Sequence, residues 1–247
     1  MARIDTLLTA AFTSLRPKPP PTCHQSDKKR YSEEVSNVVA PAFAEELRAR
    51  GLGDARPAPP GGVGLSGAER RMSGGIGAKK VDVTWATPES GLLLGISIKT
   101  TNWRDGTTKN FQKNLINRRG DMLIEGVTLH RRFPYSVLAG FFFLDMDAFQ
   151  DGTRKRKSTY FNAHQRLRIF TGREDPTGRD EQFERLYLVM MDANPFTPRY
   201  YAFQVGEMYN AVPFEQIFDD LIELLAQRNS DFYETLGGKL IKIPGTS

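Results

Sequence analysis

The chain has 247 residues, of which 39% are hydrophobic and 26% are charged, a composition typical of one large or two small globular domains. Its longest apolar run, Val137 to Leu144, is far shorter than the roughly 20 residues that span a bilayer, so we expect no membrane partner. A single cysteine excludes an internal disulfide, and three scattered histidines argue against a zinc site. The net charge of +5 permits a polyanionic partner.

The N-terminal quarter combines helical patterns with stretches rich in proline and glycine. Residues 1–15 predict a short helix and not a signal peptide, because their apolar stretch is weak and broken by threonines, and we therefore expect a cytoplasmic protein. Residues 16–29 and 51–67 are typical of linkers, and residues 31–50 predict a helix that Pro41 kinks or divides. We divide the chain into N-terminal helices and linker over 1–67, packed on or beside a core over 68–247.

The core alternates strand and helix patterns. The order of helix, two strands, helix, strand, helix, two strands and helix favours an α/β fold with one mixed sheet flanked by helices. The predicted elements are strands over 79–87 and 92–100 joined by a turn at 88–91, a helix over 107–132, a strand over 134–146, a helix over 158–170, strands over 183–192 and 199–205, and a helix over 213–234.

Polar residues lie on one face of the first two core strands. If the turn pairs Thr87 with Leu92, Asp82 stands opposite Ser97 and diagonal to Lys99. A carboxylate there can hold Mg²⁺, and a nearby ammonium can stabilise a developing anion or help to deprotonate a metal-bound water. The alternative is a surface ion pair on a half-exposed sheet. The apolar face of this hairpin would carry Val81, Val83 and Trp85 with Leu92, Leu94, Ile96 and Ile98.

The helix that follows carries a polar stripe. Its acids Asp121 and Glu125 are one turn apart, which is unfavourable unless a cation lies nearby. The alternative is a solvated helix face with an Arg118–Asp121 pair. The stripe comprises Asn114, Asn117, Arg118, Asp121, Glu125 and Thr128, and we expect Phe111, Leu115, Met122 and Leu123 to pack on the sheet.

Segments 79–83 (KKVDV) and 95–99 (GISIK) together resemble the core of the PD-(D/E)XK nuclease superfamily, the restriction-endonuclease-like fold. In that family an Asp on one strand and an acid-x-Lys motif on the next bind divalent metal and cut phosphodiester bonds. Asp82 matches the first acid and Lys99 matches the lysine. Ile98 matches the residue between, whose carbonyl often joins the metal shell. The resemblance covers residues 69–145, about a third of the chain.

The chain departs from the family pattern at two positions. Val81 stands where a proline would precede Asp82, and Ser97 replaces the second acid, which leaves a hydrogen-bonding group without the charge that Mg²⁺ needs. Some restriction enzymes of the superfamily have a Ser-x-Lys variant, with the missing acid on the following helix. The resemblance then implies Glu125 as that acid, and Asp121 and Glu69 are further candidates.

The function that the resemblance implies is a Mg²⁺-dependent (or Mn²⁺-dependent) endonuclease for double-stranded DNA, of the type II restriction or phage-defence kind. A homodimer would match the two-fold symmetry of a palindromic site. The alternatives are a nuclease-fold protein that binds DNA without cutting it, and an interaction protein whose charged hairpin face is merely solvated. The basic residues expected to hold the DNA backbone are Lys79, Lys80, Lys113, Arg118 and Arg119.

Overall fold

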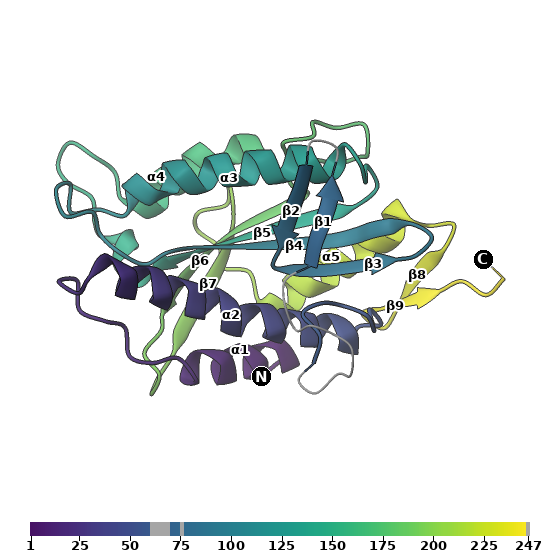
Figure 1. Cartoon of the computed structure of the whole chain (residues 1–247), viewed down its shortest axis with the longest axis horizontal. Coiled ribbons are helices and arrows are strands. Elements are labelled where there is room, and N and C mark those ends of the chain that lie inside the picture. Colours follow the sequence, from purple (N-terminus) through teal and green to yellow (C-terminus); the bar gives the residue numbers. More distant parts are fainter. Residues whose placement is uncertain (60–69, 75–76, 246–247) are drawn as a thin grey trace.

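Helices cover both faces of one central sheet in the computed structural model, which describes residues 1–59, 70–74 and 77–245 (Figure 1). The elements are α1 (Arg3–Thr13), α2 (Gln25–Ala49), β1 (Arg70–Gly74), β2 (Gly77–Val81), β3 (Val83–Thr87), β4 (Gly91–Thr101), α3 (Gln112–His130), β5 (Val137–Asp145), η1 (Met146–Phe149), α4 (Thr159–Leu167), η2 (Arg168–Phe170), β6 (Arg185–Asp192), β7 (Arg199–Gln204), α5 (Phe214–Arg228), β8 (Tyr233–Leu236) and β9 (Lys239–Lys242).

The central sheet has five strands in the order β3-β4-β5-β6-β7. Strands β4, β5 and β6 are parallel to one another, and the edge strands β3 and β7 are antiparallel to their neighbours. Strand β5 is buried along nearly its whole length, as its unbroken apolar run predicts for a strand covered on both faces. The predicted α/β class, a mixed sheet flanked by helices, is therefore confirmed.

Each face of the sheet packs against its own set of helices. Helices α1, α2 and α5 share one hydrophobic core with the sheet, in which Phe43 packs against Phe141 and Phe218. Helices α3 and α4 cover the opposite face (Figure 1), where Leu115 and Met122 are fully buried. The two N-terminal helices are thus an integral layer of the core. No helix in the described part of the chain is long and apolar enough to cross a bilayer.

Three predicted boundaries were wrong. Helix α2 begins at Gln25, inside the predicted linker, and runs unbroken through Pro41. A proline has no backbone N–H, so one helix carbonyl loses its hydrogen bond. Pro41 is exposed, so water can hydrate that carbonyl. His24 begins this helix, because its ring accepts a hydrogen bond from the Ser26 N–H. Helix α3 starts later than predicted, and α5 ends at Arg228. Strand β1 and the β8–β9 hairpin were missed.

The strand predicted over 79–87 breaks at Asp82 into β2 and β3. Strand β2 pairs with β1 in a separate two-stranded sheet that contacts α3, while β3 joins the central sheet. The bend places Val81 in the core on the α3 side and Val83 in the core on the α2 side, so the prediction that both share one face was wrong.

A β-bulge lies in the hairpin of β3 and β4. Thr87 pairs with Gly91 and not with Leu92. The extra residue of the bulge shifts the register between Trp85 and Ala86, so that Val83 faces Ile96 as predicted. As a result Leu92 packs on the α3 side, contrary to the prediction. The predicted register is confirmed from Trp85 to Val83, where the pairing ends one residue short of the predicted Asp82–Ser97 pair.

Candidate active site at the open edge of strand β4

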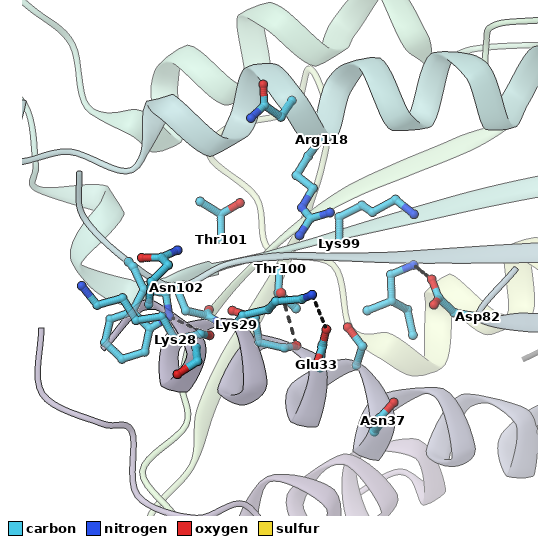
Figure 2. A pocket seen from close by; sticks show the side chains of 17 residues that line it. Lys28, Lys29, Glu33, Asn37, Asp82, Lys99, Thr100, Thr101, Asn102 and Arg118 are labelled. Atoms are coloured by element: carbon cyan, nitrogen blue, oxygen red, sulfur yellow. Dashed lines mark hydrogen bonds and ion pairs between the residues drawn. The ribbon is translucent and has the colours of Figure 1, made fainter. Parts of the chain in front are cut away.

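Strand β4 is longer than its partner β3, so the end of β4 is left as an open edge. The β3–β4 pairing ends at Val83 and Ile96, and among the described residues no strand continues it. A pocket of about 640 Å³ lies along this edge, between α2 and α3 (Figure 2). It is lined by Gln25, Ser26, Lys28, Lys29, Ser32, Glu33, Ser36 and Asn37 of α2, by Asp82, by residues 98–103, and by Asn117 and Arg118 of α3.

Asp82 lies at the bend between β2 and β3, at the start of the open edge (Figure 2). Its Oδ2 accepts a hydrogen bond of 2.5 Å from the backbone N–H of Ile98. The N–H and the C=O of one strand residue lie on the same edge of the strand, so the Ile98 carbonyl also faces the Asp82 side. A carboxylate and a backbone carbonyl therefore meet at the mouth of the pocket.

Lys99 and Glu125 form a buried ion pair beside this point. The Lys99 Nζ lies 3.0 Å from Glu125 Oε2, and the side chains of Lys99 and Glu125 are only 15% and 6% exposed. Burial would lower the pKa of Lys99, but the charges of Glu125 and Asp82 outweigh it, so the pKa of Lys99 is raised. Lys99 is thus a fixed positive charge at neutral pH.

A glycine allows α3 to approach the sheet closely enough for this pair. Gly140 of β5 pairs with Ser97, and a Cβ at Gly140 would lie only 2.6 Å from the Met122 side chain of α3. Met122 is one helical turn before Glu125, so the close approach at Gly140 also brings Glu125 to Lys99. The sequence predicted Glu125 on the polar stripe but not that it would be buried.

Ser97 lies under the same helix and is 1% exposed. Its Oγ has no hydrogen-bond partner within the described ranges 1–59, 70–74 and 77–245. With Ser97, Lys99 and Glu125 all largely buried, the alternative of a solvated surface ion pair on a half-exposed sheet does not describe this site.

Other candidate acids do not join the pair. Asp121 is about half exposed and bonds Arg118 at 3.3 Å, as the solvated-face alternative predicted for these two residues. Glu69 lies outside the described residues. Leu123, predicted to pack on the sheet, is instead 39% exposed, because the helix presents that side to solvent.

Of the five basic residues predicted to hold DNA, Arg118 alone is among the pocket-lining residues of the described chain. Lys113 is exposed and pairs with Asp105. Arg119 lies over the ring of Phe170, and Lys79 and Lys80 lie on β2. None of these four is among the residues that line the pocket.

The donor set suits a hard divalent cation. Mg²⁺ prefers oxygen ligands and keeps several waters, and the Asp82 and Glu125 carboxylates with the Ile98 carbonyl are oxygen donors. The described residues contain no group of three or more His, Cys, Asp or Glu side chains that could hold a metal. The protein would therefore supply two acids and leave the other positions to water and substrate.

Sequence reasoning missed the α2 wall of the pocket and the end of β4. Lys28, Lys29 and Asn37 come from a region of which the first part was interpreted as linker, and Thr101 and Asn102 were assigned no role. The available signal was the Lys28–Lys29 pair after a potential helix cap at His24.

Comparisons of the chain with protein-family models, with curated proteins and with solved structures found no match. The geometry of the open edge is therefore what supports a functional proposal.

Proposed function

We propose that this protein is a cytoplasmic Mg²⁺-dependent endonuclease, with Mn²⁺ as an alternative metal, which hydrolyses phosphodiester bonds of double-stranded DNA. One observation carries the proposal: at the end of β4 that lines the 640 Å³ pocket, Lys99 pairs with the buried Glu125 and the Asp82 carboxylate accepts a hydrogen bond from the Ile98 N–H. A buried ion pair is weak evidence for stability, and a chemical role is the better account of this one because Lys99 lines a pocket and the nearby Ser97 hydroxyl has no partner in the described chain.

Each residue has a role that follows from its position. Asp82, Glu125 and the Ile98 carbonyl would hold the metal, which when bound polarises the phosphate and lowers the pKa of a coordinated water. Because the pKa of Lys99 is raised, its ammonium would stabilise the charge that develops on the phosphate and would not accept a proton from water. Arg118, at the pocket wall, would hold a neighbouring phosphate.

A second candidate is a nuclease-fold protein that binds DNA without cutting it. Two observations favour it: Ser97 stands where the family has an acid, and Glu125 is already neutralised by Lys99. In that case the Lys99–Glu125 ion pair would only position the wall of the pocket. The two candidates share the DNA ligand and differ in the chemistry.

The test is cleavage of supercoiled plasmid by the wild-type protein and by the Asp82→Ala and Lys99→Ala variants, with Mg²⁺ or Mn²⁺ and with EDTA. We expect metal-dependent nicking or linearisation by the wild type and a loss of at least about 100-fold in each variant, the size seen when one transition-state contact is removed. Salt-sensitive DNA binding without cleavage in either metal would favour the second candidate. Equal cleavage by all three proteins would eliminate the site assignment.

A further inference from the structure

The Lys99 ammonium interacts with both of the acids assigned to the metal. Its Nζ lies 3.0 Å from Glu125 Oε2. Figure 2 shows its side chain extending along β4 toward Asp82 and away from Thr101. Burial would lower the pKa of Lys99, but the charges of Glu125 and Asp82 raise it, so both carboxylates act on this one ammonium. A monovalent cation of the protein therefore serves the same two acids that would hold a divalent metal.

The charges of these three residues do not balance. Glu125 and Asp82 carry two negative charges, and Lys99 carries one positive charge. A divalent cation would neutralise both carboxylates, which leaves the ammonium to neutralise the single negative charge of a phosphodiester. The three side chains therefore match a metal together with a phosphate better than they match one another.

The ion pair and a metal at Glu125 compete for one buried carboxylate. The Glu125 side chain is only 6% exposed, and two cations that touch the same buried carboxylate repel each other strongly because the protein interior screens charge weakly. The Ser97 hydroxyl, on the same face of β4 as Lys99, has no partner in the described part of the chain, so it does not help to hold the pair. Metal at Glu125 therefore requires the ammonium to leave, unless an anion lies between the two cations.

We propose that Lys99 occupies the cation position of the site in the metal-free protein and leaves Glu125 when a divalent metal binds. The proposal rests on the proposed function for the assignment of Glu125 and Asp82 to a metal. The released ammonium keeps its charge and becomes free to contact a phosphate of the substrate. Metal that binds without DNA must break the ion pair with nothing gained by Lys99, whereas with DNA the ammonium gains a new anion. The exchange thus makes metal binding weak until DNA is present, and each ligand strengthens the binding of the other.

Metal affinity in the absence of DNA tests the exchange. Mn²⁺ is titrated into the wild type and the Lys99→Met and Lys99→Arg variants, and free Mn²⁺ is followed by electron paramagnetic resonance. We expect Lys99→Met to bind Mn²⁺ about 10- to 100-fold more tightly than the wild type, the size for the loss of one competing charged hydrogen bond. Lys99→Arg keeps the charge and the ion pair, so it should bind within about 3-fold of the wild type.

The matched control is Lys113→Met. It also removes a lysine from an ion pair, since Lys113 pairs with Asp105 at 3.0 Å, but Lys113 is not among the residues that line the pocket. Its Mn²⁺ affinity should equal that of the wild type. Equal affinity of the wild type and Lys99→Met, an equal gain in Lys113→Met, or no Mn²⁺ binding by any of the proteins would overturn the exchange.

The position of the ammonium can be measured directly by nuclear magnetic resonance. With isotopically labelled lysine side chains, the Nζ resonance of Lys99 is identified by its loss in Lys99→Met, and Glu125→Gln gives its position without the ion pair. We expect Mg²⁺ to move the wild-type resonance toward its position in Glu125→Gln. A resonance that stays in place while metal binds would show that Lys99 remains on Glu125, which contradicts the exchange.

Thermal unfolding covers the case in which Lys99→Met is poorly folded. That variant leaves the buried Glu125 carboxylate without its ion pair, so it should melt at a lower temperature than the wild type in EDTA. Mn²⁺ should restore most of this loss because it supplies the missing cation, and it should raise the melting temperature of the wild type much less. A loss that Mn²⁺ does not restore would assign the pair to the fold alone.

The exchange and the proposed function can fail separately. If the wild type cuts plasmid with Mg²⁺ but Lys99→Met binds Mn²⁺ no more tightly than the wild type, the nuclease proposal stands and the exchange does not. If Lys99→Met binds Mn²⁺ more tightly and the wild type cuts no plasmid, the exchange stands on a metal-binding protein that is not a nuclease.

Discussion

Two buried glutamates at different parts of the sheet have very different surroundings. Glu184, just before β6, is 1% exposed, and each of its carboxylate oxygens has two partners. Oε1 lies 3.1 Å from Arg173 Nη1 and 3.0 Å from Arg228 Nη1, and Oε2 lies 2.7 Å from the Leu138 N–H and 3.3 Å from His130 Nε2. Glu125 is nearly as buried, but its carboxylate is held by Lys99, beside a Ser97 hydroxyl that has no partner in the described chain.

This comparison teaches that burial and charge alone do not mark a functional site. Glu184 joins the ends of α3 and α5 to the starts of β5 and β6, and both of its carboxylate oxygens are paired within the protein, as a structural role requires, although Arg173 Nε and Arg228 Nη1 of the same cluster have no hydrogen-bond partner in the described chain. The Glu125 pair lies among groups that still lack partners, next to a pocket. A buried carboxylate held by one lysine, beside an open strand edge and a pocket, indicates a place where a ligand binds better than burial, an ion pair or an unpaired donor does alone.

The largest expected effect separates the two acids of α3. Glu125→Gln should reduce plasmid cleavage by at least about 100-fold, equivalent to about 2.7 kcal/mol of barrier, because it removes a charge that the metal needs. Asp121→Asn, one turn away and exposed, should stay within about 3-fold of the wild type. The rates of plasmid cleavage by the two variants, measured at saturating metal, test both expectations. A larger loss in Asp121→Asn would move the missing acid to that position.

A second prediction concerns pH and the Glu184 cluster. Burial would raise the pKa of Glu184, but His130, the Leu138 N–H and Arg228 outweigh it and hold that pKa below its ordinary value of 4.5. A depressed carboxyl pKa stabilises the fold above the ordinary value, and that stability is lost as the pH falls below it. The difference in free energy of unfolding between wild type and Glu184→Gln should therefore shrink between pH 5 and about pH 3, measured by urea titration. A constant difference would show that the carboxylate charge contributes nothing.

The smallest expected effect is at Ser97. Because its hydroxyl has no partner in the described chain, Ser97→Ala should leave the free energy of unfolding unchanged or raise it by at most about 1 kcal/mol. A loss of more than that in urea unfolding would mean that the hydroxyl already has a structural partner. Cleavage by the same variant should fall if Ser97 bonds a water or ligand in the working site.

The sequence predicted much of what positions the site and missed what completes it. The alignment of Asp82 with the end of β4, Lys99 on the α3 side and Glu125 on the polar stripe all follow from side-chain alternation and helical spacing. The bend at Asp82 could not be predicted, because residues 80–85 alternate polar and apolar side chains without interruption. Only the pairing of β2 with β1 and of β3 with β4 reveals it.

The α2 wall of the pocket was missed for a different reason. The prolines before Lys28 suggested a linker, and a helix start depends on a cap whose side-chain geometry a propensity argument does not contain. The burial of Glu125 likewise depends on Gly140, which lies on another strand and allows Met122 to approach. Local sequence patterns do not predict contacts between segments that are distant in the sequence.

The most direct test of the central claim compares the same substitution at the two buried acids. Glu125→Gln and Glu184→Gln each replace a carboxylate by an amide of equal size, and plasmid cleavage is measured per folded molecule with Mg²⁺. We predict that Glu184→Gln keeps cleavage within about 3-fold of the wild type while it loses about 3 kcal/mol of stability, and that Glu125→Gln loses nearly all cleavage. Equal cleavage by the two variants, or a greater loss in Glu184→Gln, would contradict the assignment of the open edge as the catalytic site.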